Sequence, residues 1–229
     1  MRALISLSTA FLLGVFLSPV SAQSGGGAEV KENLDLPFDA IGLEEEDEDA
    51  PEVIVFYGQN YEGDGIFYCL DRSGSTKGQP IAKEKREVIK NIVEFSENVE
   101  FGITFYDAGL IFFPPTSRPA KADAGQKAAA TAWVNSVQSG GGSCFGKGLL
   151  KCLEMANGSS AKRNVIIYLG DGCPTCPGAN QSTYSSQILS QIAAQNYKRH
   201  NFSAIVVGSV CPEFPTALAN QNNGTYTRL

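Results

Sequence analysis

The sequence has very few of the side chains that most hydrolases depend on: it contains one histidine, His200, and one tryptophan. A Ser-His-Asp hydrolase needs a histidine base beside its nucleophile. The serines considered as nucleophiles are Ser73 and Ser75, and His200 follows a predicted helix that starts near Asp171 and runs away from them. We therefore expect no catalysis of this type and interpret the protein as a non-enzyme. We expect His200 to act with Lys198 and Arg199 as a group of cations at a helix C-terminus.

Long apolar runs are missing beyond the first 17 residues, so no membrane span is expected. At the start, Arg2 precedes an apolar stretch over residues 3–17, and Val20-Ser21-Ala22 follows. The stretch is shorter than the roughly 20 residues of a bilayer span, and the pattern is typical of a secretory signal peptide over residues 1–22, cleaved after Ala22. This predicts a secreted, periplasmic or cell-surface protein.

Basic residues are scarce in the next segment. Residues 23–52 are Gly-rich and then acidic, with eleven acids and a single cation, Lys31, between positions 29 and 52. Such self-repelling composition predicts a disordered linker. Eleven acids against one cation give this segment a net charge of −10, so the acidity behind the chain's formal net charge of −6 belongs to the linker. Because residues 53–229 also lack a concentrated basic stripe, we expect no nucleic-acid partner.

Residues 53–229 alternate between strand-like and helix-like patterns, and their length suits one domain. "VIVFYG" and "GIFYCL" flank the Gly- and Asp-containing "QNYEGD", which predicts a β-hairpin between them. Later apolar runs such as "NVIIYLG" are too continuous for a sheet with one wet face. The sequence therefore predicts an α/β domain: a doubly wound, mostly parallel six-stranded sheet with helices on both faces and an extra N-terminal hairpin strand. A helix capped by Ser182 is expected after residue 181.

Three polar segments lie where parallel strands end or helices begin: "DRSGST", "GGGSCFG" and "GDGCPTC". In doubly wound sheets, ligands bind beyond the carboxyl ends of the strands. The segments offer two carboxylates and three hydroxyls, from Asp71, Ser73, Ser75, Ser143 and Asp171. Hard oxygen donors suit Mg²⁺ first, with Mn²⁺ or Ca²⁺ as alternatives, rather than zinc. The sequence therefore predicts a divalent-cation site from these five residues.

The three segments resemble the von Willebrand factor type A domain with its metal-ion-dependent adhesion site, in its bacterial, secreted form. "DRSGS" matches the family's Asp-x-Ser-x-Ser loop, "GGSCFGKGL" its Gly-Gly-Thr segment, and "YLGDG" its Thr-Asp-Gly turn. Serine replaces threonine at 143, glycine replaces threonine at 170, and Thr76 stands where many members have methionine. Arg72 places a cation near the site, where it either pairs with an incoming acid or lowers ion affinity.

The resemblance implies an adhesion or protein-interaction module that binds an Asp or Glu of a protein partner through the cation. Two alternatives remain open at this point. One is a scaffold domain of the same family that binds no ion. The other is a thiol-disulfide redox protein, because "CPTC" has the spacing of a redox motif.

Six cysteines in an exported chain favour disulfides. We expect Cys211 to lie within reach of Cys173 and Cys176, and for these cysteines a structural disulfide is favoured over a redox-active pair or a zinc site shared with Cys144. Cys69 and Cys152 are predicted to be buried, either free or paired with each other. The connectivity does not follow from the sequence.

Overall fold

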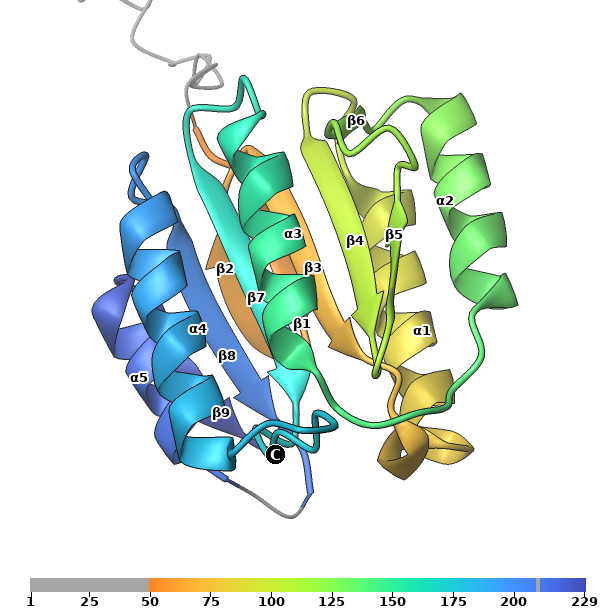
Figure 1. Cartoon of the computed structure of the whole chain (residues 1–229). Helices are drawn as coiled ribbons and strands as arrows, with labels where there is room; N and C mark the ends of the chain where they lie inside the picture. Colours follow the sequence, from red (N-terminus) through yellow and green to blue (C-terminus); the bar gives the residue numbers. More distant parts are fainter. Residues whose placement is uncertain (1–49, 209–210) are drawn as a thin grey trace, which may run out of the picture. The chain divides into compact units, whose positions relative to one another are not determined.

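The computed structural model describes residues 50–208 and 211–229 (Figure 1). The predicted signal peptide and most of the predicted linker lie outside these residues. The strands are β1 Val53–Phe56, β2 Gln59–Glu62, β3 Gly65–Asp71, β4 Glu100–Tyr106, β5 Leu110–Phe113, β6 Ala120–Lys121, β7 Asn164–Gly170, β8 Asn201–Val206 and β9 Tyr226–Arg228. The helices are α1 Gln79–Glu94, α2 Ala124–Ser136, α3 Phe145–Asn157, α4 Gln181–Gln195 and α5 Glu213–Gln221.

The main sheet confirms the predicted α/β class. Its strand order is β5-β4-β3-β7-β8-β9, and the short β6 pairs with β4 at one end. The pairings among β4, β3, β7, β8 and β9 are parallel, whereas β5 runs antiparallel to β4. The chain leaves the central β3 toward β4 and later returns to its other side as β7, so the order of strands reverses beside β3.

Alternate side chains of the strands enter two separate cores. In β3, Ile66, Tyr68 and Leu70 point to the face covered by α1 and α2. Phe67 and Cys69 point to the face covered by α3, α4 and α5. Both faces are therefore buried, which explains why the strands read as continuous apolar runs.

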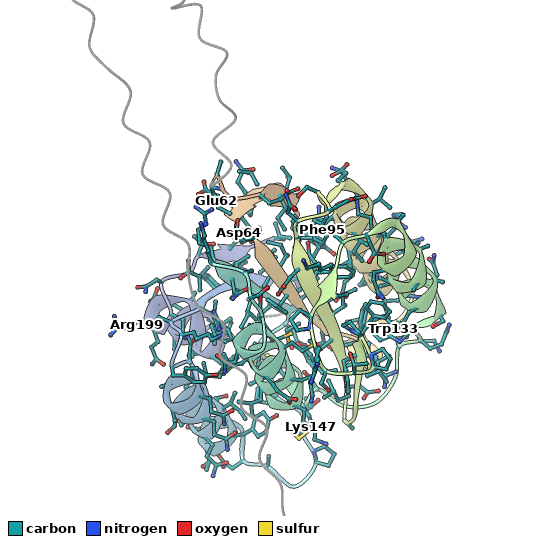
Figure 2. All side chains as sticks on the ribbon, turned by 90° about the horizontal axis from the view of Figure 1, so that it is seen from above. Glu62, Asp64, Phe95, Trp133, Lys147 and Arg199 are labelled. Carbon is teal, nitrogen blue, oxygen red and sulfur yellow. A yellow bond between two sulfur atoms is a disulfide. The ribbon has the colours of Figure 1, made fainter. Side chains whose placement is uncertain are left out.

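Aromatic rings extend the first core to the edge of the sheet. Trp133 of α2, labelled in Figure 2, lies 5.8 Å from the ring of Phe105 and 5.9 Å from that of Phe113, between centroids. These residues come from α2, β4 and β5, so the edge strand β5 is held by packing as well as by its ladder.

The predicted hairpin partner is wrong. β1 pairs with β2, not with β3, and the two form a separate two-stranded sheet. The turn is Tyr57-Gly58, both with positive φ (51° and 75°), a geometry typical of a two-residue hairpin turn. The glycine and aspartate of "QNYEGD" instead lead into β3.

The hairpin covers part of the first sheet face. Ile54, Phe56 and Tyr61 belong to the same buried cluster as α1 and β3. The buried Asn91 of α1 donates a hydrogen bond to the Val55 carbonyl and accepts one from the Tyr68 hydroxyl, each 2.8 Å long. One amide therefore ties the hairpin to both the helix and the sheet.

Two local predictions are corrected. Helix α4 is capped by Asn180, whose side chain accepts a hydrogen bond from the Thr183 amide, so the cap lies two residues before Ser182. His200 is buried rather than part of a cationic group: its Nε2 lies 3.1 Å from Asn157 Oδ1. Burial, helped by the charge of Lys198, lowers the pKa of His200 to about 4, so the ring is neutral at pH 7.

In the part of the chain that the structure describes, we find no helix of the length and apolar character needed to cross a bilayer.

Candidate metal centre

The five predicted ligand residues gather at the carboxyl end of the sheet, where the order of strands reverses. Asp71 is the last residue of β3 and Asp171 follows the last residue of β7. The two strands are neighbours, and Leu70 of β3 pairs with Leu169 of β7. The loop before α3 brings Ser143 to the same end. Asp71 thus meets Ser143, 72 residues later in the sequence, at the position where doubly wound sheets bind ligands.

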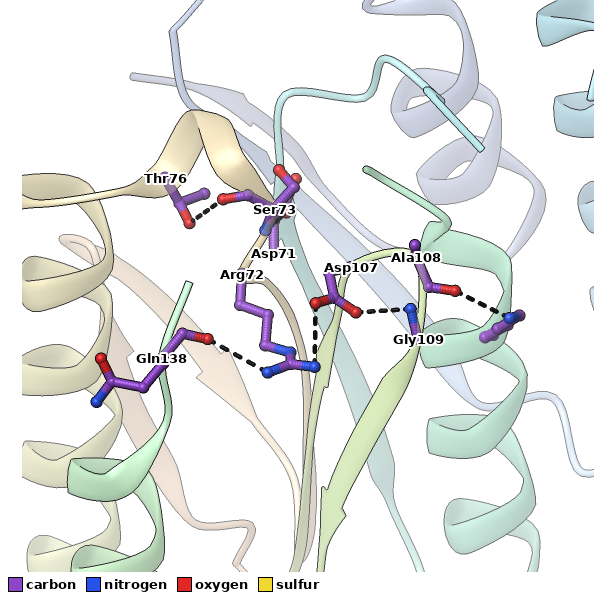
Figure 3. Close-up of polar contacts among 9 residues, drawn as sticks. Asp71, Arg72, Ser73, Thr76, Asp107, Ala108, Gly109 and Gln138 are labelled. Atoms are coloured by element: carbon purple, nitrogen blue, oxygen red, sulfur yellow. Dashed lines mark hydrogen bonds and ion pairs between the residues drawn. The ribbon is translucent and has the colours of Figure 1, made fainter. Parts of the chain in front are cut away.

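The loop after β3 is organised by short hydrogen bonds (Figure 3). The Ser73 amide donates to Asp71 Oδ1 at 2.6 Å, and Thr76 Oγ1 donates to the Ser73 carbonyl at 2.8 Å. The hydroxyl oxygens of Ser73 and Ser75 are 2.9 Å apart. A 3-10 turn over Gly74–Thr76 holds this arrangement. Thr76 thus stabilises the loop by a cap-like hydrogen bond that a methionine side chain lacks.

Ser143 connects the loop after β3 with the loop after β7. Its Oγ lies 3.4 Å from Asp71 Oδ2, a distance at the weak limit of a hydrogen bond. Its amide donates to Thr175 Oγ1 at 2.8 Å, and its carbonyl accepts from the Thr175 amide at 3.0 Å. Asp171 in turn accepts the Cys173 amide at 2.9 Å. Thr175 was not a predicted site residue, because only the fold places it against Ser143.

Burial makes the charged form of the Asp71 carboxyl less favourable. Asp71 is 2% exposed, and burial raises its pKa to about 6 despite hydrogen bonds from Ser73 and Ser143 that favour the charged form. The charge of Asp171 adds to the rise. Burial also raises the pKa of Asp171. A bound cation would lower both pKa values, because its positive charge would stabilise the two carboxylates in place of the water that burial removes.

The oxygen atoms of the five candidate residues suit a hard divalent cation, and hydroxyl oxygens would have to provide part of its coordination. Among the described residues, no three His, Cys, Asp or Glu side chains come together as a metal-binding group. Asp71 and Asp171 would supply two carboxylates to such an ion, and Ser73, Ser75 and Ser143 would supply hydroxyl oxygens. No imidazole or thiolate belongs to the set, which disfavours softer metals.

A cavity of about 590 Å³ opens beside these residues, and Asp71, Ser75 and Asp171 line part of it. Its wall also contains Glu84 of α1, which is 3% exposed and whose Oε1 has no hydrogen-bond partner in the described structure. Burial raises the pKa of Glu84 well above its usual value, and the charge of Asp71 adds to the rise.

The predicted structural disulfides are present, and each cysteine of "CPTC" is bonded to a partner outside that motif. Cys144 is bonded to Cys176, and Cys173 to Cys211. Cys173 and Cys176 therefore do not form a pair that could cycle between thiol and disulfide, and Cys144 is not available to a zinc ion. Cys69 and Cys152 are both buried and free, one of the two predicted outcomes. The two disulfides connect the loop of Ser143, the loop after Asp171 and the loop of Cys211.

The sequence did not identify Asp107 as part of this edge. Asp107 follows the last residue of β4, and its Oδ2 lies 3.0 Å from Nη2 of Arg72 (Figure 3). Arg72 is thus directed toward Asp107 and away from the space beside Asp71. A signal was present, since the carboxyl end of β4 adjoins that of β3 and both are followed by charged residues.

Gly170 occupies the position of the family's threonine because two tyrosines fill the adjacent space. A Cβ at Gly170 would lie 2.3 Å from the Tyr106 hydroxyl and 2.7 Å from that of Tyr168. The two rings stack with centroids 6.1 Å apart, and both are fully buried. The neighbours can therefore not move aside without disturbing the second core.

We expect Gly170→Thr to destabilise the protein by about 1–3 kcal/mol, the usual cost of overpacking. Urea denaturation measures this change. Gly140→Thr is a matched control, because a Cβ at Gly140 meets no atom within 4 Å. Tyr106→Phe combined with Gly170→Thr should restore part of the loss. Equal stability of the Gly170→Thr and Gly140→Thr proteins would contradict the explanation.

Comparisons with known proteins agree with this architecture. No family model matches the chain. The human inter-alpha-trypsin inhibitor heavy chain H4 is 23% identical over 188 residues, which cover 79% of this chain and 19% of the human protein. A von Willebrand factor type A structure from Catenulispora acidiphila has a TM-score of 0.63 at 16% identity, over 72% of this chain and 38% of that chain.

A third similar structure is proximal thread matrix protein 1 from the mussel byssus, described with a zinc-occupied MIDAS motif. Its TM-score is 0.53 at 17% identity, over 72% of this chain and 41% of the mussel protein. This chain thus spans less than half the length of all three proteins. The described part of the chain has the von Willebrand factor type A fold: a mostly parallel sheet with helices on both faces.

Proposed function

We propose that the domain binds a divalent cation, Mg²⁺ in the first place, through Asp71, Ser73, Ser75, Ser143 and Asp171. The observation that carries this proposal is the buried Asp71 carboxyl. Ser73 and Ser143 contact it, the charge of Asp171 acts on it, and Arg72 is turned away from it. Mn²⁺ and Ca²⁺ are the next candidates, because they prefer the same oxygen donors.

We further propose that the site serves to bind a protein partner and carries out no reaction of its own. A divalent ion held by only two carboxylates supplies an electrophilic position for one more anionic oxygen. The Asp or Glu side chain of a partner provides such an oxygen. The zinc-occupied MIDAS motif of the mussel protein supports the ion-binding part of this proposal.

The disulfides support a location outside the reducing cytosol. Two bonds join loops at the candidate site, and disulfides persist mainly in oxidising compartments. We propose a secreted, periplasmic or cell-surface protein, in agreement with the signal peptide predicted for residues 1–22.

The cation is tested by calorimetric titration of the protein with Mg²⁺, Mn²⁺ and Ca²⁺. We expect one site per chain, and Asp171→Asn should weaken it strongly. Glu97→Gln is the matched control, since Glu97 is an exposed carboxylate on the loop after α1, at the amino end of the neighbouring strand β4. Absence of binding by all three ions would reject the metal site and favour the ion-free scaffold.

The partner chemistry needs a second measurement. An acidic peptide should bind the protein in Mg²⁺ and lose binding in EDTA, and the same peptide with amides in place of its carboxylates should not bind in either condition. Binding that persists in EDTA would show that the carboxylate is recognised without the cation.

A further inference from the structure

We propose that Arg72 and Asp107 are positioning residues that hold segment 138–144 in place and, through it, the Ser143 hydroxyl beside Asp71. The pair itself is a structural arrangement. Its consequence for ion binding rests on the function proposed above.

Arg72 connects two loops that come from different parts of the chain (Figure 3). Its Nη2 lies 3.0 Å from Asp107 Oδ2, and its Nη1 donates to the Gln138 carbonyl at 3.3 Å. The two charged side chains are only 19% and 12% exposed. They are therefore screened less by water and salt than an ordinary surface pair.

Backbone hydrogen bonds extend this connection along segment 138–144. The Gly140 amide donates to the Arg72 carbonyl at 2.8 Å, and the Gly74 amide donates to the Gly141 carbonyl at 3.0 Å. At the far end, the Cys144 amide donates to the Asp107 carbonyl at 3.0 Å. Ser143 thus lies in a segment held at both ends by residues 72–74 and 107.

The segment also fits closely over the Asp107 carboxylate. A Cβ at Gly141, which has φ of +76°, would lie 3.2 Å from Asp107 Oδ2. Asp107 is itself fixed, because its Oδ1 accepts the Gly109 amide at 2.6 Å. The carboxylate therefore serves as a rigid support for the glycines that precede Ser143.

For the removal of Arg72, the electrostatic effect and the positioning effect predict opposite changes in cation affinity. Removal of Arg72 takes away a positive charge near the proposed cation and leaves the Asp107 carboxylate unneutralised. Through the electric field alone, both changes would tighten binding of a divalent cation. If Arg72 instead positions Ser143, its removal weakens binding, as loss of an outer contact around metal ligands usually does.

The first test is Arg72→Ala in the full chain, with the Mg²⁺ dissociation constant measured by calorimetry. We expect binding about 10–100-fold weaker. Lys77→Ala, which removes an exposed cation from the same loop, is the control and should bind as tightly as the unmodified protein or more tightly. Unchanged or tighter binding by Arg72→Ala would overturn the proposal.

The second test asks whether Arg72 acts through Ser143. In a Ser143→Ala background, Arg72→Ala should cause little further loss of Mg²⁺ affinity, because the hydroxyl that it positions is already gone. Losses that add fully would indicate two independent contributions and reject the positioning role.

Hydrogen exchange provides a measurement that needs no ion. In the Arg72→Ala protein without metal, the Gly74 and Gly140 amides should exchange faster, whereas amides in the centre of β3 keep their protection. Unchanged exchange at both glycines overturns the positioning role whatever the affinities are. If Arg72→Ala speeds exchange at these glycines but the unmodified protein binds no Mg²⁺, the metal-binding function is rejected. The structural role of Arg72 in holding segment 138–144 is then retained.

Discussion

Asp71→Asn is expected to abolish Mg²⁺ binding at concentrations that saturate the unmodified protein. Asparagine keeps the size of the side chain and one acceptor oxygen but removes one of the two negative charges of the site. Loss of one member of a buried charge pair costs about 3–5 kcal/mol, which corresponds to a dissociation constant at least ~100-fold weaker. Calorimetry with Mg²⁺ measures the change, and near-normal affinity would remove Asp71 from the site.

In the metal-free protein, Asp71→Asn should instead be favourable: it should raise the stability of the fold near neutral pH. The folded-state pKa of Asp71 is about 6, above the ordinary 3.8, so the folded protein binds this proton more tightly than the unfolded chain does. The stability that the proton contributes is present below about pH 4 and is lost as the pH rises to about 6. Two pKa units correspond to about 3 kcal/mol.

This effect is read from urea denaturation in EDTA between pH 4 and 7. The unmodified protein should lose stability relative to Asp71→Asn across this range, and the difference between the two profiles isolates Asp71 from the other acids. Ser75→Ala should follow the unmodified profile, because it leaves the carboxyl in place. Parallel profiles for the unmodified and Asp71→Asn proteins would contradict the raised pKa.

The second large effect concerns the Cys144–Cys176 bond. Its sequence separation is 32 residues, and a bond that closes a loop of this size stabilises a protein by about 3–4 kcal/mol. We expect the Cys144→Ser, Cys176→Ser double variant to lose this amount in urea denaturation. It should also bind Mg²⁺ more weakly, because Cys144 adjoins Ser143.

The other disulfide provides the comparison. Cys173–Cys211 spans 38 residues, so its removal should cost similar stability, and it adjoins the loop of Asp171 rather than that of Ser143. Reduction of the unmodified protein should reproduce the sum of the two losses. A double variant at 144 and 176 with unchanged stability would show that hydrogen bonds alone, such as those of Thr175, hold these loops.

The sequence predicted the parts of the fold that depend on periodicity. Apolar runs such as that of β7 indicated strands buried on both faces, and the polar residues at their ends indicated a shared edge. The hairpin was placed wrongly because the Gly and Asp of "QNYEGD" looked like turn residues. The actual turn, Tyr57-Gly58, places a tyrosine at positive φ, which residue preferences disfavour.

The remaining errors concern contacts between distant segments. The disulfide connectivity could not be predicted, because only the fold brings Cys144 close to Cys176 and Cys211 close to Cys173. His200 looked like a member of a basic group, yet its ring contacts Asn157, 43 residues earlier. Asp107 and Arg72 are ordinary loop residues in sequence, and only the adjacency of β3 and β4 makes them a pair.

Because of the two disulfides, the loops at the carboxyl edge of the sheet differ in how rigidly they are attached. The loops that follow β7 and β8 are cross-linked covalently, whereas the loop that follows β3 is attached to segment 138–144 by hydrogen bonds and to Asp107 by an ion pair. A tensile force applied at this edge would therefore meet a stiff half and a compliant half. Under such a load, the edge would open first between Arg72 and Asp107, while Ser143 and Asp171 would stay together on the cross-linked side.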